Sequence, residues 1–166
     1  MALDPDAVRL RPVTPEEYDA FFAMYEVYER ELDPFDPDPA GDRAQSSEHI
    51  EVYRAAILED LADAESGREL FWVEVAGARA GFCMTRTLPD WPDPTLNVAE
   101  VVEFYIDPAH RRRGTGRAAV EALLAIHRAR GTRLVEAAIL RDNAAAHEFW
   151  GALGFQVRSV VTARRP

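Results

Sequence analysis

The stretch HRRRGTGRAAVEALL, residues 110–124, gathers cations where a helix is expected to begin. Its arginines, which surround Gly114 and Gly116, are Arg111, Arg112, Arg113 and Arg117. A cation near a helix N-terminus costs roughly 0.3–1 kcal/mol, because that end of the helix dipole is positive. A phosphate would reverse this cost, since free backbone N–H groups and guanidinium groups bind its oxygens and glycine permits close approach. The stretch therefore predicts a phosphate or pyrophosphate site, with a merely solvated basic loop as the alternative.

Two known phosphate-binding motifs can be compared with this stretch. A Walker A loop requires lysine, and the chain contains none. Residues 114–119, GTGRAA, fit the dinucleotide pattern G-x-G-x-x-A, and Glu136 lies 20 residues beyond Gly116, where a ribose-binding acid is expected. However, the preceding strand should end near Ile106, leaving seven residues before the first glycine, and only 30 residues follow Glu136. An NAD-type dinucleotide-binding protein is therefore kept as a remote alternative.

The first half of the chain should supply a strand, two helices and a hairpin. Residues 8–13 alternate apolar and polar side chains, as a half-buried strand does. Residues 14–17, TPEE, resemble a capping box, so a helix should run from there to about Leu32. Three prolines in residues 33–42 prevent its continuation, and a second helix should begin near Ser46 or Ser47 and end by Gly67. Two strands then flank Ala76-Gly77-Ala78 as a hairpin.

The second half alternates strands and helices. The expected elements are a long strand over Asn97–Ile106, a helix after the arginine–glycine loop with Gly131 near its end, a strand over Arg133–Leu140, a helix over Asn143–Gly154, and one or two strands in residues 155–163. The predicted order is β-α-α-β-β-β-α-β-α-β. We therefore expect a mixed α/β fold and a single domain over residues 1–166.

Composition and charge narrow the function classes. The chain has 166 residues, 48% of them hydrophobic, and one cysteine, Cys83, so it cannot form an internal disulfide. The N-terminal residues lack a signal-peptide pattern and no apolar run approaches a membrane span, so we expect a cytoplasmic protein. Residues 1–66 hold 18 acids against 5 arginines, a net charge of −13, whereas residues 67–166 have a net charge of +3. The acidic charge of the first segment disfavours nucleic acid or an anionic membrane surface as its partner. Solubility is the simplest explanation of this charge, and attraction of a cation is the alternative.

Two segments together resemble the GNAT superfamily of acetyl-CoA-dependent N-acyltransferases. The loop fits that family's [Gln/Arg]-x-x-Gly-x-[Gly/Ala] pattern through Arg111, Gly114 and Gly116. The later segment NAAAHEFWGALGF fits Asn-x-x-Ala-x-x-aromatic-aromatic followed by Leu-Gly-Phe, through Asn143, Ala146, Phe149, Trp150, Leu153, Gly154 and Phe155. The resemblance covers roughly residues 98–157 and implies a central mixed sheet that is splayed beside the coenzyme.

The resemblance also implies a coenzyme site. Residues 111–117, which include Thr115, would bind the pyrophosphate of acetyl-CoA through backbone N–H groups, and Arg111–Arg113 could contact its 3′-phosphate. The strand residues Phe104, Tyr105 and Ile106 would run beside the pantetheine arm. Asn143 would lie near the sulfur, although an asparagine there also suits the N-cap of the next helix. Acetyl-CoA is the implied cosubstrate, and no metal is expected.

The implied reaction is direct attack of an amine on the acetyl thioester. The backbone N–H of Ile106 would stabilise the developing oxyanion. Glu103 is the candidate general base, because it alternates with Tyr105 on one face of the strand, opposite Phe104 and Ile106; an outward-facing glutamate is the alternative, and Glu100 is a lesser candidate. Trp150 stands where the family often has tyrosine. Because an indole N–H cannot give up its proton, Trp150 would either order the thiolate or anchor the core.

The acceptor is expected on the side of the first two helices. That region holds the acidic residues Asp33, Asp36, Asp38 and Asp42, with Tyr25, Tyr28 and Phe35 as candidate substrate-binding residues. We therefore expect a cationic amine such as a polyamine, an aminosugar or a basic peptide end. A coenzyme A-binding sensor without catalysis is the alternative from another function class. Exposed strand edges and the aromatic first helix are compatible with a homodimer.

Overall fold

The computed structural model describes residues 7–35 and 47–164, with side chains from residue 50 onward in the second of these segments. Its centre is a five-stranded sheet of order β1-β2-β3-β4-β5. The strands are β1 (Val8–Pro12), β2 (Arg68–Val75), β3 (Ala78–Pro89), β4 (Asn97–Ile106) and β5 (Leu134–Ala137). The first four are antiparallel to their neighbours, and β5 pairs in parallel with β4. A doubly wound dinucleotide-binding sheet is mostly parallel, so this topology does not match that alternative.

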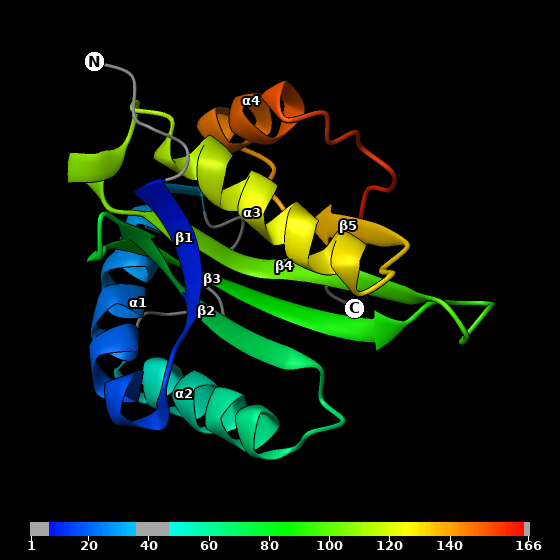
Figure 1. The fold of residues 1–166 in the computed structure, drawn as a ribbon, viewed down its shortest axis with the longest axis horizontal. Coiled ribbons are helices and arrows are strands. Elements are labelled where there is room, and N and C mark those ends of the chain that lie inside the picture. Colours follow the sequence, from blue (N-terminus) through cyan, green and yellow to red (C-terminus); the bar gives the residue numbers. More distant parts are fainter. Residues whose placement is uncertain (1–6, 36–46, 165–166) are drawn as a thin grey trace.

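Four helices cover the two faces of the sheet. The helices are α1 (Tyr18–Leu32), α2 (Ser47–Ala62), α3 (Thr115–Ala129) and α4 (Ala144–Ala152). Helices α1 and α2 lie on one face, and α3 and α4 lie on the other (Figure 1). Alternate strand residues supply the two cores: Trp72 and Phe82 pack with the α1 aromatics, whereas Phe71 and Cys83 pack with residues of α3 and α4.

The predicted boundaries follow from local chemistry that the structure contains. The backbone N–H of Thr14 donates to Glu17 Oε2 at 3.1 Å, and a short 3-10 turn at Pro15–Glu17 leads into α1. Gly77, at φ +85°, supplies the turn between β2 and β3. Asn143 Oδ1 accepts from the Ala146 N–H at 3.1 Å and so caps α4.

An irregularity in β4 opens the sheet. Met84 pairs with Glu103 and Thr85 pairs with Val101, so Val102 is an extra residue on the β4 side. Beyond this bulge β4 continues to Ile106, but β5 pairs only with Val98–Val101 and ends at Ala137. The two strands therefore separate, which confirms the predicted splayed mixed sheet.

The prediction of one or two strands in residues 155–163 is wrong. Within the described part of the chain, residues 155–164 form neither helix nor strand. The alternating pattern was misleading because no facing layer covers its apolar positions: Val157, Val160 and Val161 are 79%, 80% and 92% exposed. The segment contacts the sheet through an ion pair between Arg158 and Glu136 rather than through a strand ladder.

The described residues contain neither a membrane-spanning helix nor a cluster of metal-binding side chains. No helix in residues 7–35 and 47–164 is both long and apolar enough to cross a bilayer. In the same residues, no group of three or more His, Cys, Asp or Glu side chains is placed to hold a metal ion.

Candidate active site

The loop between β4 and α3 contains two residues in the left-handed region. Gly114 precedes α3 with φ +91°, and Arg112 has φ +60°, a value uncommon outside glycine. Turns that contain left-handed residues can form backbone nests that bind anions. A Cβ built on Gly114 would have no neighbour within 4 Å, so the space beside this glycine is open.

The N–H groups of this loop are uncapped. Ala118 N donates to Gly114 O at 3.0 Å, but the backbone N–H groups of Arg112–Arg117 meet no acceptor among residues 7–35 and 47–164. Thr115, which is 1% exposed, also buries a hydroxyl that has no partner within these residues. Unpaired donors at the positive end of a helix favour a bound anion. These observations fit the predicted phosphate site.

The four arginines of the loop differ in their contacts. The side chains of Arg112 and Arg113 have no acceptor in the described part of the chain, and both residues are exposed. Arg117 Nη2 donates to Ala152 O at 3.2 Å, which links α3 to α4. Arg111 turns away from the loop: its Nε donates to Ile106 O at 2.6 Å and its Nη2 to Glu31 Oε2 at 2.6 Å.

The end of β4 directs backbone groups toward the gap beside β5. Ile106 is paired with Gly81, while Asp107 N donates to Ala80 O at 2.8 Å. In an antiparallel ladder this pattern makes Ile106 a non-hydrogen-bonded position, and so is Phe104 two residues earlier. The N–H groups of both residues therefore point away from β3. They face the space beyond the end of β5, where β4 has no partner strand on that side. This is the placement expected for an oxyanion donor at Ile106.

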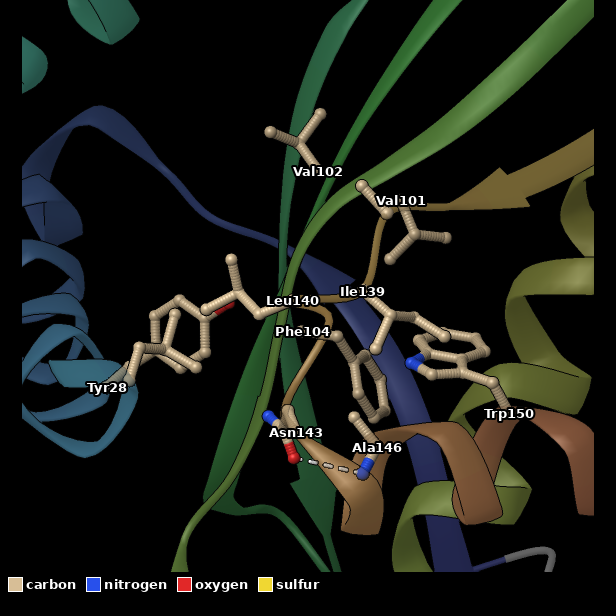
Figure 2. Close-up of a pocket in the computed structure, with 11 residues that line it drawn as sticks. Tyr28, Val101, Val102, Phe104, Ile139, Leu140, Asn143, Ala146 and Trp150 are labelled. Carbon is tan, nitrogen blue, oxygen red and sulfur yellow. Dashed lines mark hydrogen bonds between the residues drawn. The ribbon is translucent and has the colours of Figure 1, made fainter. Parts of the chain in front are cut away.

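A cavity of about 90 Å³ occupies the gap. Its lining comes from α1, β4, the segment after β5, and α4, and consists of Tyr28, Leu32, Val101, Val102, Phe104, Ala138, Ile139, Leu140, Asn143, Ala146 and Trp150. Figure 2 shows Trp150 with its indole nitrogen directed toward the middle of these side chains, and Asn143 with its amide oxygen directed at Ala146. The cavity thus brings together three residues predicted for the coenzyme site, Phe104, Asn143 and Trp150, and one predicted for the acceptor, Tyr28.

Trp150 is also part of the core. It is 6% exposed, and its ring centroid lies 5.6 Å from that of Phe104, 5.2 Å from Phe149 and 4.8 Å from Phe155. Aromatic pairs at these separations stabilise a fold beyond the area that they bury. The structure therefore shows Trp150 as a core anchor that also lines the cavity, and its role in ordering the thiolate stays a prediction.

Glu103 lies on the other face of β4, between two phenols. Tyr28 Oη donates to its Oε2 at 2.6 Å, and Tyr53 Oη donates to its Oε1 at 3.0 Å. Burial, followed by the negative charge of Glu103, raises the pKa of both tyrosines far above the usual value. The phenols therefore remain proton donors that orient the carboxylate. Tyr28 also lines the cavity, so a single side chain joins the gap to Glu103.

The three residues predicted to bind the acceptor have different positions. Tyr28 lies at the cavity, as expected. Tyr25 is a core residue, 3% exposed, which donates to Glu29 at 2.7 Å and stacks on Tyr53 with centroids 5.1 Å apart. Phe35 lies in the short 3-10 turn Asp33–Phe35 and does not line the cavity. The predicted acidic residues Asp36, Asp38 and Asp42 lie outside the described residues.

Sequence reasoning missed two residues of the site, Tyr53 and Glu31. Tyr53 lies in α2, and nothing in the local sequence links it to a carboxylate 50 positions away. Glu31 accepts from Tyr105 Oη at 3.1 Å and from Arg111, which is 80 positions away. Both pairings arise from the packing of helices on the sheet, so local spacing gave no signal for them.

The sequence profile of the acetyltransferase (GNAT) family matches residues 21–155 of the chain. The chain belongs to this family. An uncharacterized N-acetyltransferase of Methanocaldococcus jannaschii is 39% identical over 64 residues, which are 39% of this chain and 28% of that protein. The matched part of the chain thus spans less than a third of that relative's length.

Solved structures of GNAT proteins share the fold. A GCN5-related N-acetyltransferase from Ralstonia eutropha superposes with a TM-score of 0.72 at 18% identity, covering 95% of this chain and 98% of that one. A ribosomal-protein-alanine N-acetyltransferase from Brucella melitensis gives a TM-score of 0.70 at 17% identity, covering 96% and 99%. At such identities these likenesses establish the fold and not the substrate.

GNAT membership supports an acyltransferase activity, and acetyl-CoA is the donor that this family generally uses. The residues present fit that group, since the uncapped N–H groups of Arg112–Arg117 and the orphaned Thr115 hydroxyl provide donors for a pyrophosphate. In this GNAT protein, Trp150 is among the residues that line the gap.

Proposed function

We propose that the protein is an N-acetyltransferase that transfers an acetyl group from acetyl-CoA to a primary amine of a cationic acceptor by direct attack. One observation about β4 carries the proposal. This strand directs the N–H groups of Phe104 and Ile106 into the gap, and it also holds Glu103 on the face covered by α1, beside Tyr28. An uncapped helix N-terminus follows within ten residues. Acetyl-CoA would supply the thioester, and Arg112–Arg117 would hold its phosphates.

Each group of the chain then has a defined task. The Ile106 N–H donates a hydrogen bond to the negative charge that develops on the thioester oxygen, and it needs no reorganisation because β4 fixes its direction. Glu103 accepts the amine proton, directly or through water. Tyr28 and Tyr53 keep the carboxylate in place through their two hydrogen bonds.

The departing thiolate needs no protein acid in this proposal. Trp150 can donate a hydrogen bond from its indole nitrogen but cannot transfer a proton usefully. A thiol has a pKa of about 8.5, so its anion is a tolerable leaving group near neutral pH. Solvent then protonates the sulfur, and Trp150 serves to order it.

The charge around Glu103 supports a cationic acceptor. Helix α1 carries two further acids near Glu103: Glu29 accepts a hydrogen bond from Tyr25, and Glu31 accepts one from Tyr105. The first 66 residues carry a net charge of −13. An acceptor with a second positive charge would gain Coulomb attraction at this wall, and this gain would weaken as salt increases.

An amine panel tests the proposal. The purified protein is incubated with acetyl-CoA and with polyamines, aminosugars or peptides with basic ends, and thiol release is read with a thiol-reactive dye. We expect release above the rate without protein for at least one cationic amine, and calorimetric binding of acetyl-CoA but not of NAD. Binding of acetyl-CoA without thiol release for any amine would reject the enzymatic proposal.

That outcome would favour a second candidate, a coenzyme A-binding sensor. The observation behind this candidate is Trp150, whose indole is packed against Phe104, Phe149 and Phe155 and offers no hydroxyl at the gap. A sensor would retain the anion loop and change conformation or partner affinity on binding, with no turnover.

A further inference from the structure

Arg111 contacts different groups from the other arginines of the anion loop. Its backbone N–H donates to Pro108 O at 3.3 Å, so even its amide is engaged. Its guanidinium donates from Nε to Ile106 O and from Nη2 to Glu31 Oε2, both at 2.6 Å. The same group lies over the ring of Tyr105, 5.3 Å from the centroid. Protein groups thus engage two of its five guanidinium N–H donors and hold the guanidinium toward β4 and α1.

These contacts join three elements at the reacting end of the site. Ile106 is the last residue of β4, Glu31 lies in the last turn of α1, and Arg111 begins the loop before α3. Tyr105 Oη donates to Glu31 Oε1 at 3.1 Å, so Glu31 receives both the arginine and the phenol. The planar guanidinium suits this arrangement, because its donors point along fixed directions in one plane.

We propose that Arg111 is a positioning residue, not a phosphate ligand: with Glu31 it fixes the end of β4 against α1, and so sets the position of Ile106 relative to the wall that faces the acceptor. The inference rests on the proposed function, since that function gives Ile106 and α1 their tasks. It revises the expectation from the family motif that Arg111 contacts the coenzyme.

The exposure of the Arg111–Glu31 ion pair indicates that Arg111 contributes to positioning more than to folding stability. The Arg111 and Glu31 side chains are 40% and 37% exposed, and ion pairs at such sites contribute little to folding stability. A shift in the direction of the Ile106 N–H, in contrast, acts directly on the reacting group, because catalysis depends on sub-ångström placement. The expected defect is therefore in turnover of the amine and not in folding or in coenzyme binding.

Four variants test the inference. Arg111→Gln and Glu31→Gln remove the ion pair from either side, while Arg112→Gln and Arg113→Gln change exposed arginines of the same loop. For each we would measure the Kd of acetyl-CoA by calorimetry, kcat/KM for the best amine of the panel, and the urea midpoint of unfolding. In Arg111→Gln and Glu31→Gln, kcat/KM should fall about fivefold or more while the Kd of acetyl-CoA changes by less than about twofold. Arg112→Gln and Arg113→Gln should weaken acetyl-CoA binding.

Two further variants exclude an effect of charge alone. Arg111→Lys keeps the charge but loses the planar donor fork, so it should behave like Arg111→Gln. The double variant Arg111→Gln/Glu31→Gln should fall no further than Arg111→Gln, because the two residues act through one contact. Recovery of wild-type turnover by Arg111→Lys would overturn the inference.

The outcomes for this inference and for the proposed function are distinct. If wild-type protein binds acetyl-CoA and releases thiol, but Arg111→Gln weakens coenzyme binding as much as Arg112→Gln does, then Arg111 is a phosphate ligand and only the inference fails. If the wild-type protein binds no acetyl-CoA or releases no thiol with any amine, the proposed function fails, and the positioning role fails with it.

Discussion

Gly114 shows how one residue can combine a backbone requirement with a binding role. Its φ of +91° lies in the left-handed region, and no atom would meet a Cβ there within 4 Å. A side chain at this position therefore costs backbone strain and projects into the open space beside the uncapped N–H groups. Strain and ligand obstruction can be separated experimentally, because Gly77 has a nearly equal φ of +85°, also with no neighbour within 4 Å, at a hairpin turn far from the loop in sequence.

We predict that Gly114→Ala and Gly77→Ala each lower the free energy of unfolding by about 1–2 kcal/mol, since both place a Cβ in a left-handed conformation. Only Gly114→Ala should weaken acetyl-CoA binding, by about tenfold or more, because only its methyl group faces the anion site. Urea unfolding and calorimetry measure the two effects. Equal coenzyme affinity in the two variants would argue against the loop as the binding site.

At Glu103 the prediction concerns turnover. Glu103→Gln keeps an oxygen for one of the two tyrosine hydroxyls but removes the basic carboxylate. We expect kcat to fall by about 100-fold or more while the Kd of acetyl-CoA stays within twofold of wild type. Glu100→Gln, three residues earlier on the same strand, is the matched control and should change kcat little. A larger loss from Glu100→Gln would assign the base to that residue.

Protonation of the buried His127 imidazole should make the folding stability depend on pH. It is 1% exposed on α3, and its Nδ1 lies 3.2 Å from Thr132 Oγ1. Burial, followed by the charge of Arg130, lowers the pKa of His127 below 6.5. Between the lowered folded value and 6.5 the unfolded chain binds more protons, so the folded state loses stability as pH falls through this window.

We therefore predict that the wild-type free energy of unfolding decreases from pH 7.5 to pH 5.5, by no more than about 1.4 kcal/mol per pH unit from this group. His127→Gln should flatten that decrease, and His147→Gln, which alters an exposed histidine on α4, should not. Urea titrations of the three proteins at both pH values give the comparison. An unchanged slope in His127→Gln would assign the effect to other groups.

At the scale of elements, the site depends on how β4 is held by β3 and released by β5. Gly81 of β3 allows the close approach, since a Cβ there would lie 2.0 Å from Tyr105 O and 3.0 Å from Ile106 Cα. Both of those atoms are backbone and cannot turn aside. Any side chain at residue 81 must therefore displace the part of β4 that carries the proposed oxyanion donor.

Gly81→Ala should accordingly lower both stability and turnover, by about 1–3 kcal/mol of unfolding free energy for an overpacked position and by more than tenfold in kcat. Gly151→Ala is the control: it lies in α4 with no neighbour within 4 Å, and alanine there should stabilise the helix by up to about 1 kcal/mol. Wild-type kcat in Gly81→Ala would show that the position of β4 is not critical.

The order and limits of most elements were predictable because their signals are local. The capping box before α1, the glycine turn of the hairpin and the Asn143 cap are each set within a few residues. The pairings of Glu103 with Tyr53 and of Arg111 with Glu31 were not predictable, since these partners are 50 and 80 residues distant and are brought close by helix packing. The strand prediction for residues 155–163 was wrong for a related reason. An alternating pattern indicates a strand only where a neighbouring strand is available to pair with, and β5 ends after four residues.

At the scale of the whole molecule, charge separates the two sides of the proposed reaction. The acidic first 66 residues supply α1 and α2, and the arginine-rich loop leads into α3. The arrangement in Figure 1 places these helices on opposite faces, with β4 between them. A polyanionic coenzyme and a cationic acceptor would each meet a field of opposite sign.

This separation predicts a salt response that differs from one acceptor to another. Raising the ionic strength from about 0.05 M to about 0.5 M, which shortens the screening length severalfold, should raise KM more for an amine with a second positive charge than for a monoamine of similar length. Steady-state kinetics with a matched diamine and monoamine test this. Equal salt responses would contradict a role for the acidic wall in acceptor selection.

In the proposed enzyme the uncapped amides of Arg112–Arg117 hold the phosphates of acetyl-CoA. An amide ¹H–¹⁵N titration of the isotope-labelled protein with acetyl-CoA tests this contact most directly. We expect the largest and saturable shifts at these six residues, with smaller ones at Phe104 and Ile106. Saturable binding that leaves the six amides unmoved and shifts residues elsewhere would contradict it.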